Sequence, residues 1–153
     1  MLRILCIVLL TGGLAALSQA QNTPKKNIYL TDGRAEVSNV FRPRSPTDAD
    51  LFYLYIRKYQ EISISVGSNS VYLSKENECG MYFRLFDDKG IETKIGDAPA
   101  GVDSWSGYVE KAGMFKIKVQ MGCLESFTLK QLTAKKPVFK YDLKIYQRPA
   151  SSR

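Results

Sequence analysis

The chain contains no histidine among its 153 residues. Histidine is the commonest general base near neutral pH and a frequent zinc ligand, so Ser–His and Cys–His nucleophile pairs and most zinc sites are excluded. No long stretch after the first twenty residues has the apolar period of about 3.6 that is typical of an amphipathic helix. A Gly-rich phosphate loop in front of a helix is therefore excluded as well.

Carboxylates are the remaining candidates for acid–base or metal chemistry. The aspartates fall in segments expected to be turns, where aspartate is common for backbone reasons. A catalytic pair is therefore the least favoured interpretation, and we expect no enzyme. Calcium binds loop oxygens, and the weak candidate ligands are Asp48, Asp50, Asp97 and Asp103. No other cofactor or metal is expected.

Long apolar runs are also absent, apart from one at the N-terminus. Residues 1–20 have a basic start, an apolar middle that contains two glycines, and Ser-Gln-Ala at the end. This pattern is typical of a secretory signal peptide cleaved after Ala20. A retained anchor is the alternative, although the run is short against the ~20 residues of a membrane span. Cys6 lies inside the run, which argues against lipid attachment. We expect a periplasmic or extracellular protein without a membrane span.

Cysteine is scarce, with three in the chain, and removal of the signal peptide leaves Cys79 and Cys123. Two cysteines in an exported chain usually pair. A disulfide that closes a loop of about 44 residues would stabilise the fold by about 4 kcal/mol on the chain-entropy account. Two free thiols are the alternative.

Negative charge is in the minority, and the formal net charge is +7. A basic exported protein favours anionic surfaces such as cell-wall polymers or acidic proteins, and simple solubility is the alternative explanation. The cations are spread along the chain except for the pairs Lys25-Lys26 and Lys135-Lys136. They do not form a nucleic-acid-binding footprint with interleaved aromatic residues.

Apolar and polar residues alternate with period two through most of the chain. Turn signals such as Thr31-Asp32-Gly33-Arg34 and Asp87-Asp88-Lys89-Gly90 separate the runs. This pattern predicts one all-β domain over residues 28–147, a jelly-roll-like antiparallel β-sandwich of about nine strands. Residues 21–27 are expected to be flexible and 148–153 a disordered tail. The expected strands span residues 27–30, 35–41, 51–57, 61–66, 81–86, 91–95, 104–109, 115–119, 127–132 and 138–146, with a short edge strand at 71–73.

The only tryptophan, Trp105, lies in the run Ser-Trp-Ser-Gly-Tyr-Val. Alternation places Trp105 and Gly107 on one face of a strand and Ser106 and Tyr108 on the other. We favour Trp105 as a core residue whose neighbour Gly107 permits close ring packing; a role in recognition is the alternative. Loops at sandwich ends often carry function and tyrosine often anchors interfaces. Ser104, Ser106 and Tyr108 are therefore candidate contact residues.

Five segments, in this order, resemble the bacterial pre-peptidase C-terminal domain: TDADLFYLYI, QEISISV, YFRLFDDKG, DSWSGYVEKAGMFKIKV and ESFTLKQL. The resemblance covers residues 28–146. It implies a jelly-roll-like sandwich without catalytic activity, which usually serves as an accessory binding domain on secreted enzymes.

The size, the basic charge and the closing segment TAKKPVFKYDLKIY are similar to those of periplasmic inhibitors of g-type and i-type lysozyme. That resemblance implies a protein-binding inhibitor whose loops around residues 96–108 and 122–138 occlude a cleft. Such inhibitors are associated with Ser-Gly followed a little later by Tyr; Ser106-Gly107-Tyr108 is similar but lacks an intervening residue. The implied partner-binding residues are Ser104, Ser106, Tyr108, Lys135 and Lys136. The alternative function is a carbohydrate- or matrix-binding accessory module, with or without structural calcium, whose partner is a cell-wall polysaccharide.

Overall fold

The computed structural model describes residues 26–68, 72–74, 77–93, 101–123, 127–135 and 137–149. The expected signal peptide, residues 1–20, lies outside the described residues. So do residues 94–100, which belong to the loop expected near Trp105.

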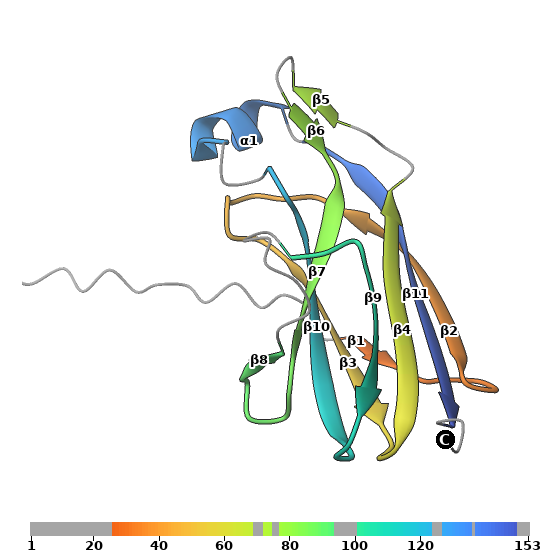
Figure 1. The fold of residues 1–153 in the computed structure, drawn as a ribbon. Helices are drawn as coiled ribbons and strands as arrows, with labels where there is room; N and C mark the ends of the chain where they lie inside the picture. Colours follow the sequence, from red (N-terminus) through yellow and green to blue (C-terminus); the bar gives the residue numbers. More distant parts are fainter. Residues whose placement is uncertain are drawn as a thin grey trace, which may run out of the picture.

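Two sheets form the molecule, and their strands are shown in Figure 1. The five-stranded sheet has the order β1-β3-β10-β7-β8 and the four-stranded sheet the order β2-β11-β4-β9. The first contains β1 (Lys26–Ile28), β3 (Asp50–Ile56), β10 (Gly113–Met121), β7 (Met81–Phe86) and β8 (Glu92–Thr93). The second contains β2 (Arg34–Phe41), β11 (Phe139–Pro149), β4 (Gln60–Ser68) and β9 (Ser104–Val109). A separate two-stranded ribbon contains β5 (Tyr72–Ser74) and β6 (Asn77–Cys79).

These sheets confirm the prediction of an all-β sandwich. Every pairing in the two large sheets is antiparallel except β1 with β3. The ordered part is slightly longer than residues 28–147. Lys26 already pairs with Phe52, and Pro149 still pairs with Gln60. Strand pairing thus extends two residues beyond the expected domain bounds at each end.

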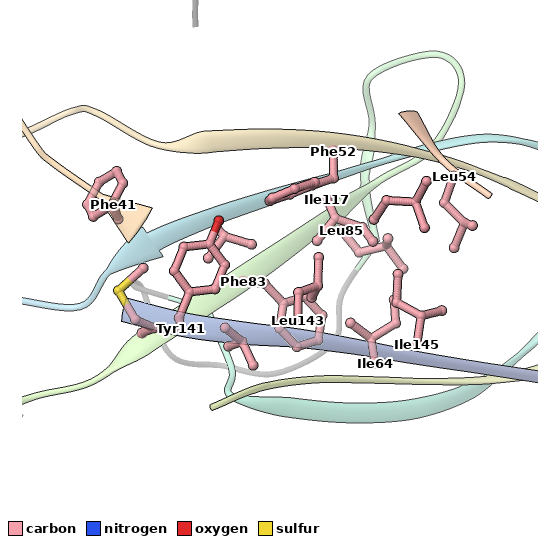
Figure 2. Packing of buried hydrophobic residues seen from close by; sticks show 14 of the residues in the cluster. Phe41, Phe52, Leu54, Ile64, Phe83, Leu85, Ile117, Tyr141, Leu143 and Ile145 are labelled. Atoms are coloured by element: carbon pink, nitrogen blue, oxygen red, sulfur yellow. The ribbon is translucent and has the colours of Figure 1, made fainter. Parts of the chain in front are cut away.

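The core lies between the two sheets and takes every second residue of each strand, as the alternation predicts. Phe52, Phe83 and Leu143 are completely buried. The ring of Tyr141 packs edge-on against Phe52, with centroids 6.5 Å apart. Figure 2 shows these rings between aliphatic side chains from both sheets. The sandwich is thus held by apolar contacts that leave the outward-facing residues available for function.

The strand predicted over residues 127–132 is wrong, because α1 (Leu129–Lys135) occupies this segment. Thr128 and Gln131 form a capping box. The Thr128 N–H donates to Gln131 Oε1 at 2.8 Å, and the Gln131 N–H donates to Thr128 Oγ1 at 3.3 Å. This reciprocal cap starts a helix, and Leu132 then turns into the core with 1% of its surface exposed. No helix within the described ranges is long and apolar enough to cross a membrane.

The two ends of the sandwich differ, as Figure 1 shows. One end carries α1 and the β5–β6 ribbon, and we call it the helix end. The other carries the β3–β4 and β9–β10 turns together with the end of β11, and we call it the turn end. Tyr108 pairs with Glu61 and Glu61 with Arg148, so these residues lie near the turn end.

Candidate functional site

The outward-facing residues of β9 include the three contact residues that the sequence suggests on this strand. Ser104, Ser106 and Tyr108 are exposed, whereas Trp105 is partly buried and packs against the core. The indole lies so close over Gly107 that a Cβ atom at this position would overlap it. Trp105 is therefore a packing residue, as expected, and the polar face of β9 is open to solvent.

A groove of about 700 Å³ crosses the outer face of the four-stranded sheet near the turn end. Two cross-strand rows of side chains build it. The first row consists of Ser106, Ser63, Tyr146 and Arg34, each paired with the next across β9, β4, β11 and β2. The second row consists of Tyr108, Glu61 and Arg148. The groove is therefore made by register across four strands and not by one loop.

The small side chains of the first row form the floor of the groove. The hydroxyl groups of Ser63 and Ser106 lie 2.6 Å apart and share one hydrogen bond. A pair of hydroxyls has two hydrogens and uses one of them in this bond. The second hydroxyl hydrogen can therefore be donated to a ligand in the groove.

Aromatic rings border this floor. Tyr146 is 48% exposed, and the guanidinium carbon of Arg34 lies 5.9 Å from its ring centroid. Tyr108 is 49% exposed and stacks on Tyr59, with ring centroids 6.4 Å apart. Lys58 extends over the Tyr59 ring. Rings held by such contacts lose little conformational freedom when a partner binds.

Four charged side chains line the groove: Asp32, Arg34, Glu61 and Arg148. Arg148 Nε donates to Glu61 Oε2 at 2.7 Å, so this pair neutralises itself. Within the described part of the chain, no ion pair is formed by Arg34. Arg34 is therefore the cation of the groove whose guanidinium N–H groups can donate hydrogen bonds to a ligand.

The backbone of Arg34 is fixed by a two-residue hairpin. Thr31 and Arg34 exchange two backbone hydrogen bonds of 2.9 Å, and Asp32 and Gly33 both have positive φ, 51° and 73°. Positive φ at both central residues is the geometry of a type I′ turn. The Gln147 N–H also donates to the Gly33 carbonyl at 2.7 Å. This turn anchors Arg34 at the start of β2.

Further exposed tyrosines surround the groove at the turn end. A second groove of about 620 Å³ lies on the other side of the hairpin and shares Asp32, Gly33 and Gln147 with the first. Tyr29 and Tyr55 line it and are both exposed. The large exposed residues of this end are thus mainly tyrosines: Tyr29, Tyr55, Tyr59, Tyr108 and Tyr146.

The lysines of the expected contact set do not join this surface. Lys135 ends α1 at the helix end, and β11 begins nearby at Phe139, whereas Arg148 marks the groove at the opposite end of β11. Lys136 lies outside the described residues, as do residues 94–100. The structure thus brings Ser106 and Tyr108 to the groove, places Ser104 one row further along β9, and separates Lys135 from all three.

The aspartates proposed as weak calcium ligands have separate structural contacts. Asp48 caps its own turn and accepts hydrogen bonds from the N–H groups of Arg44 and Ser45 at 2.6 and 3.1 Å. Asp103 accepts one from the Ser104 hydroxyl, and Asp97 lies outside the described residues. Among the residues that the structure describes, no group of three or more Asp, Glu, His or Cys side chains could hold a metal ion.

Asp50 belongs to a polar network that connects the two sheets. Its Oδ2 accepts hydrogen bonds from Tyr141 OH at 2.7 Å and from Asn39 Nδ2 at 2.8 Å, and Lys26 Nζ donates to Asn39 Oδ1 at 2.8 Å. Burial raises the pKa of the Tyr141 hydroxyl far above its usual value; Asn39 lowers it in part, and the Asp50 carboxylate raises it further. The phenol is therefore a fixed neutral donor, which gives this network a structural role.

The sequence does not reveal the groove as a unit. Arg34, Ser63, Tyr146 and Arg148 come from three strands, and each is an ordinary outward-facing residue in its own run. The only signal in the sequence is the polar half of each alternation. Which polar residues become neighbours depends on strand order and register, which the local pattern does not specify.

Comparisons with known proteins support the fold. No protein-family model matches the chain, and no curated protein sequence matches it. The crystal structure of Aeromonas hydrophila PliG, a periplasmic lysozyme inhibitor of g-type lysozyme, is similar with a TM-score of 0.51 and 14% sequence identity. The match covers 81% of this chain and 96% of that chain. At this identity it shows a shared fold.

Two further structures of the same kind match over similar lengths. Salmonella Typhimurium PliG is 18% identical with a TM-score of 0.47, over 81% of this chain and 97% of that chain. A mutant of the Escherichia coli inhibitor is 17% identical with a TM-score of 0.47, over the same shares of the two chains. The resemblance to the pre-peptidase C-terminal domain stays a prediction.

Proposed function

We propose that the protein is exported and binds a protein partner with the groove face of its four-stranded sheet, and that this partner is a lysozyme, which it inhibits. The observation that carries the proposal is the composition of that face. Tyrosine, serine and arginine gather there around a groove of about 700 Å³. Tyrosine and serine are enriched in antibody paratopes, and tyrosine and arginine are enriched in interface hot spots.

The choice of lysozyme as the partner is supported by the fold. The g-type inhibitor of Aeromonas hydrophila has a similar fold over nearly its whole length. Ser106-Gly107-Tyr108 is similar to the Ser-Gly and Tyr residues associated with lysozyme inhibitors, and Ser106 and Tyr108 lie in the groove. The expected signal peptide would deliver the chain to the compartment in which lysozymes attack a bacterial cell wall.

A non-catalytic mode of action agrees with the chemistry of the chain. It contains no histidine. In the groove Glu61 is paired with Arg148, and Arg34 lies over the Tyr146 ring. Occlusion needs only a complementary surface, which the strands of a sandwich hold rigidly.

The test is lysis of a peptidoglycan suspension by g-type, i-type and c-type lysozymes with the mature protein added at micromolar concentration. We expect inhibition of at least one of them, and the g-type enzyme is the first candidate. The Ser63→Trp variant, which fills the floor of the groove, should lose inhibition. Failure of the native protein to inhibit any of the three would refute the proposal.

A saccharide-binding module is the second candidate, and the exposed Tyr59–Tyr108 pair beside a polar groove favours it. Aromatic faces next to hydroxyl and carboxylate groups suit a sugar polymer as well as a protein. Retention on insoluble peptidoglycan, abolished by Tyr108→Ala, with no inhibition of any lysozyme, would support this candidate over the first.

A further inference from the structure

We infer that Arg34 is the charged anchor of the groove and that it binds a carboxylate on a protruding acidic segment of the protein partner. This inference rests on the proposed function and adds the chemistry of the contact. It also adds a residue that the Ser106-Gly107-Tyr108 segment does not contain.

The first argument is the state of the charges in the groove. Glu61 neutralises Arg148 at 2.7 Å, which leaves Asp32 and Arg34. Asp32 also lines the second groove, whereas Arg34 lines the first one alone. The planar guanidinium lies over Tyr146 at 5.9 Å and, among the described residues, has no carboxylate partner. Its fork of N–H donors matches a carboxylate.

The second argument is that the donors converge. Arg34, Tyr146, Ser63 and Ser106 lie in one cross-strand row. Adjacent strands are about 4.8 Å apart, and the Arg34 side chain extends over the intervening Tyr146. A carboxylate that enters above the serines would meet the guanidinium on one side and the remaining hydroxyl hydrogen of the Ser63–Ser106 pair below.

The third argument is preorganisation. A type I′ turn and the Gln147–Gly33 hydrogen bond hold the backbone beside Arg34, and the Tyr146 ring supports its guanidinium. The positive net charge, +7 over all 153 residues, favours approach to an acidic partner over a longer range. The groove itself is concave, so the partner supplies the protruding segment and this sheet supplies the receptor.

The experiment measures association and dissociation rates of native and variant protein on an immobilised lysozyme that the native protein inhibits. Arg34→Ala should raise the dissociation rate about tenfold or more, with little change in the association rate, because the loss of an anchor contact acts after encounter. Arg34→Lys keeps the charge but not the planar fork, and it should lose most of the same affinity.

Lys140→Ala is the matched control. Lys140 is exposed on the same strand and face as Tyr146, about 20 Å away at about 3.3 Å per residue. The Lys140→Ala substitution removes the same charge as Arg34→Ala. It should leave the dissociation rate within about twofold of that of the native protein. Thermal unfolding of each variant verifies that the fold is intact.

A double-mutant cycle identifies the partner group. Carboxylate-to-amide variants of the lysozyme are tested with native protein and with Arg34→Ala. With one of these lysozyme variants, Arg34→Ala should lower the affinity much less than it does with the unaltered lysozyme. If the native protein binds and Arg34→Ala dissociates no faster, this inference fails while the proposed function stands. If the native protein binds no lysozyme, both are overturned.

Discussion

At the scale of single residues, the close approach of Trp105 to Gly107 is the most sensitive point of β9. A Cβ atom at position 107 would overlap the indole. Gly107→Ala should therefore displace the ring and lower the free energy of unfolding by about 1–3 kcal/mol, as overpacking does. Since Trp105 is the only tryptophan, its fluorescence should also shift to longer wavelength.

Gly67 provides the control for this substitution. It lies on the outward face of β4, and a Cβ atom there would meet nothing within 4 Å. Gly67→Ala should leave the emission maximum unchanged and should not lower the unfolding midpoint, because alanine restricts the unfolded chain without a clash in the folded one. Equal effects of the two substitutions would contradict the packing role of Trp105.

Tyr141 is a second residue with a measurable signature. Tyr141→Phe removes the hydrogen bond to Asp50 (2.7 Å) and should lower the free energy of unfolding by about 1–2 kcal/mol near pH 7. Burial raises the pKa of this phenol in the folded state. Above the usual tyrosine pKa of about 10, the unfolded chain therefore loses a proton that the folded chain keeps, and stability falls as the pH rises.

Urea unfolding between pH 8 and pH 11 measures that dependence. The native protein should lose stability progressively above about pH 10, and Tyr141→Phe should lose less over the same interval. Parallel curves for the two proteins would show that the buried phenol does not contribute.

At the scale of elements, α1 depends on its N-terminal cap. Thr128→Ala removes the side-chain oxygen that accepts from the Gln131 N–H and should cost about 1 kcal/mol of unfolding free energy. Thr128→Ser keeps the oxygen and should cost much less. Urea unfolding of the two variants measures the difference; equal losses would indicate that packing of Leu132 alone holds the helix.

The same helix shows where prediction from sequence reaches its limit. Alternation located nearly all the strands, because inward residues of a sandwich repeat with period two. Phe127, Leu129 and Gln131 imitate that period over a short segment. The Thr128–Gln131 capping box is the competing signal, and in the helix that it starts Leu132 is buried whereas Leu129 is exposed.

The groove was predictable only in part, for a different reason. Ser106 and Tyr108 follow from the alternation within β9. Arg34 and Tyr146 become their neighbours through the pairings of β2, β11, β4 and β9, which join residues that lie far apart in the sequence. Lys135 was grouped with them through the resemblance to lysozyme inhibitors, and its place at the end of α1 separates it from them.

At the scale of the whole molecule, the predicted Cys79–Cys123 disulfide would tie the end of β6 to the segment after β10. The backbones already meet next to both cysteines, since the Gly122 N–H donates to the Gly80 carbonyl at 3.0 Å. Mass spectrometry of the non-reduced, exported protein should detect the linked peptides. Cys79→Ala should lower stability by about 2–5 kcal/mol. Recovery of two alkylated thiols would contradict the pairing.

At the scale of the whole molecule, the central claim is that the protein binds its partner with the groove face of the four-stranded sheet. The most direct test is calorimetric titration of a g-type lysozyme with native protein, Tyr108→Ala and Tyr55→Ala. Tyr108 lines the first groove, whereas Tyr55 lines the second and comes from the five-stranded sheet. We predict binding by the native protein, a loss of about tenfold or more in affinity for Tyr108→Ala, and little change for Tyr55→Ala. Absence of binding by the native protein, or equal losses for the two variants, would contradict the account.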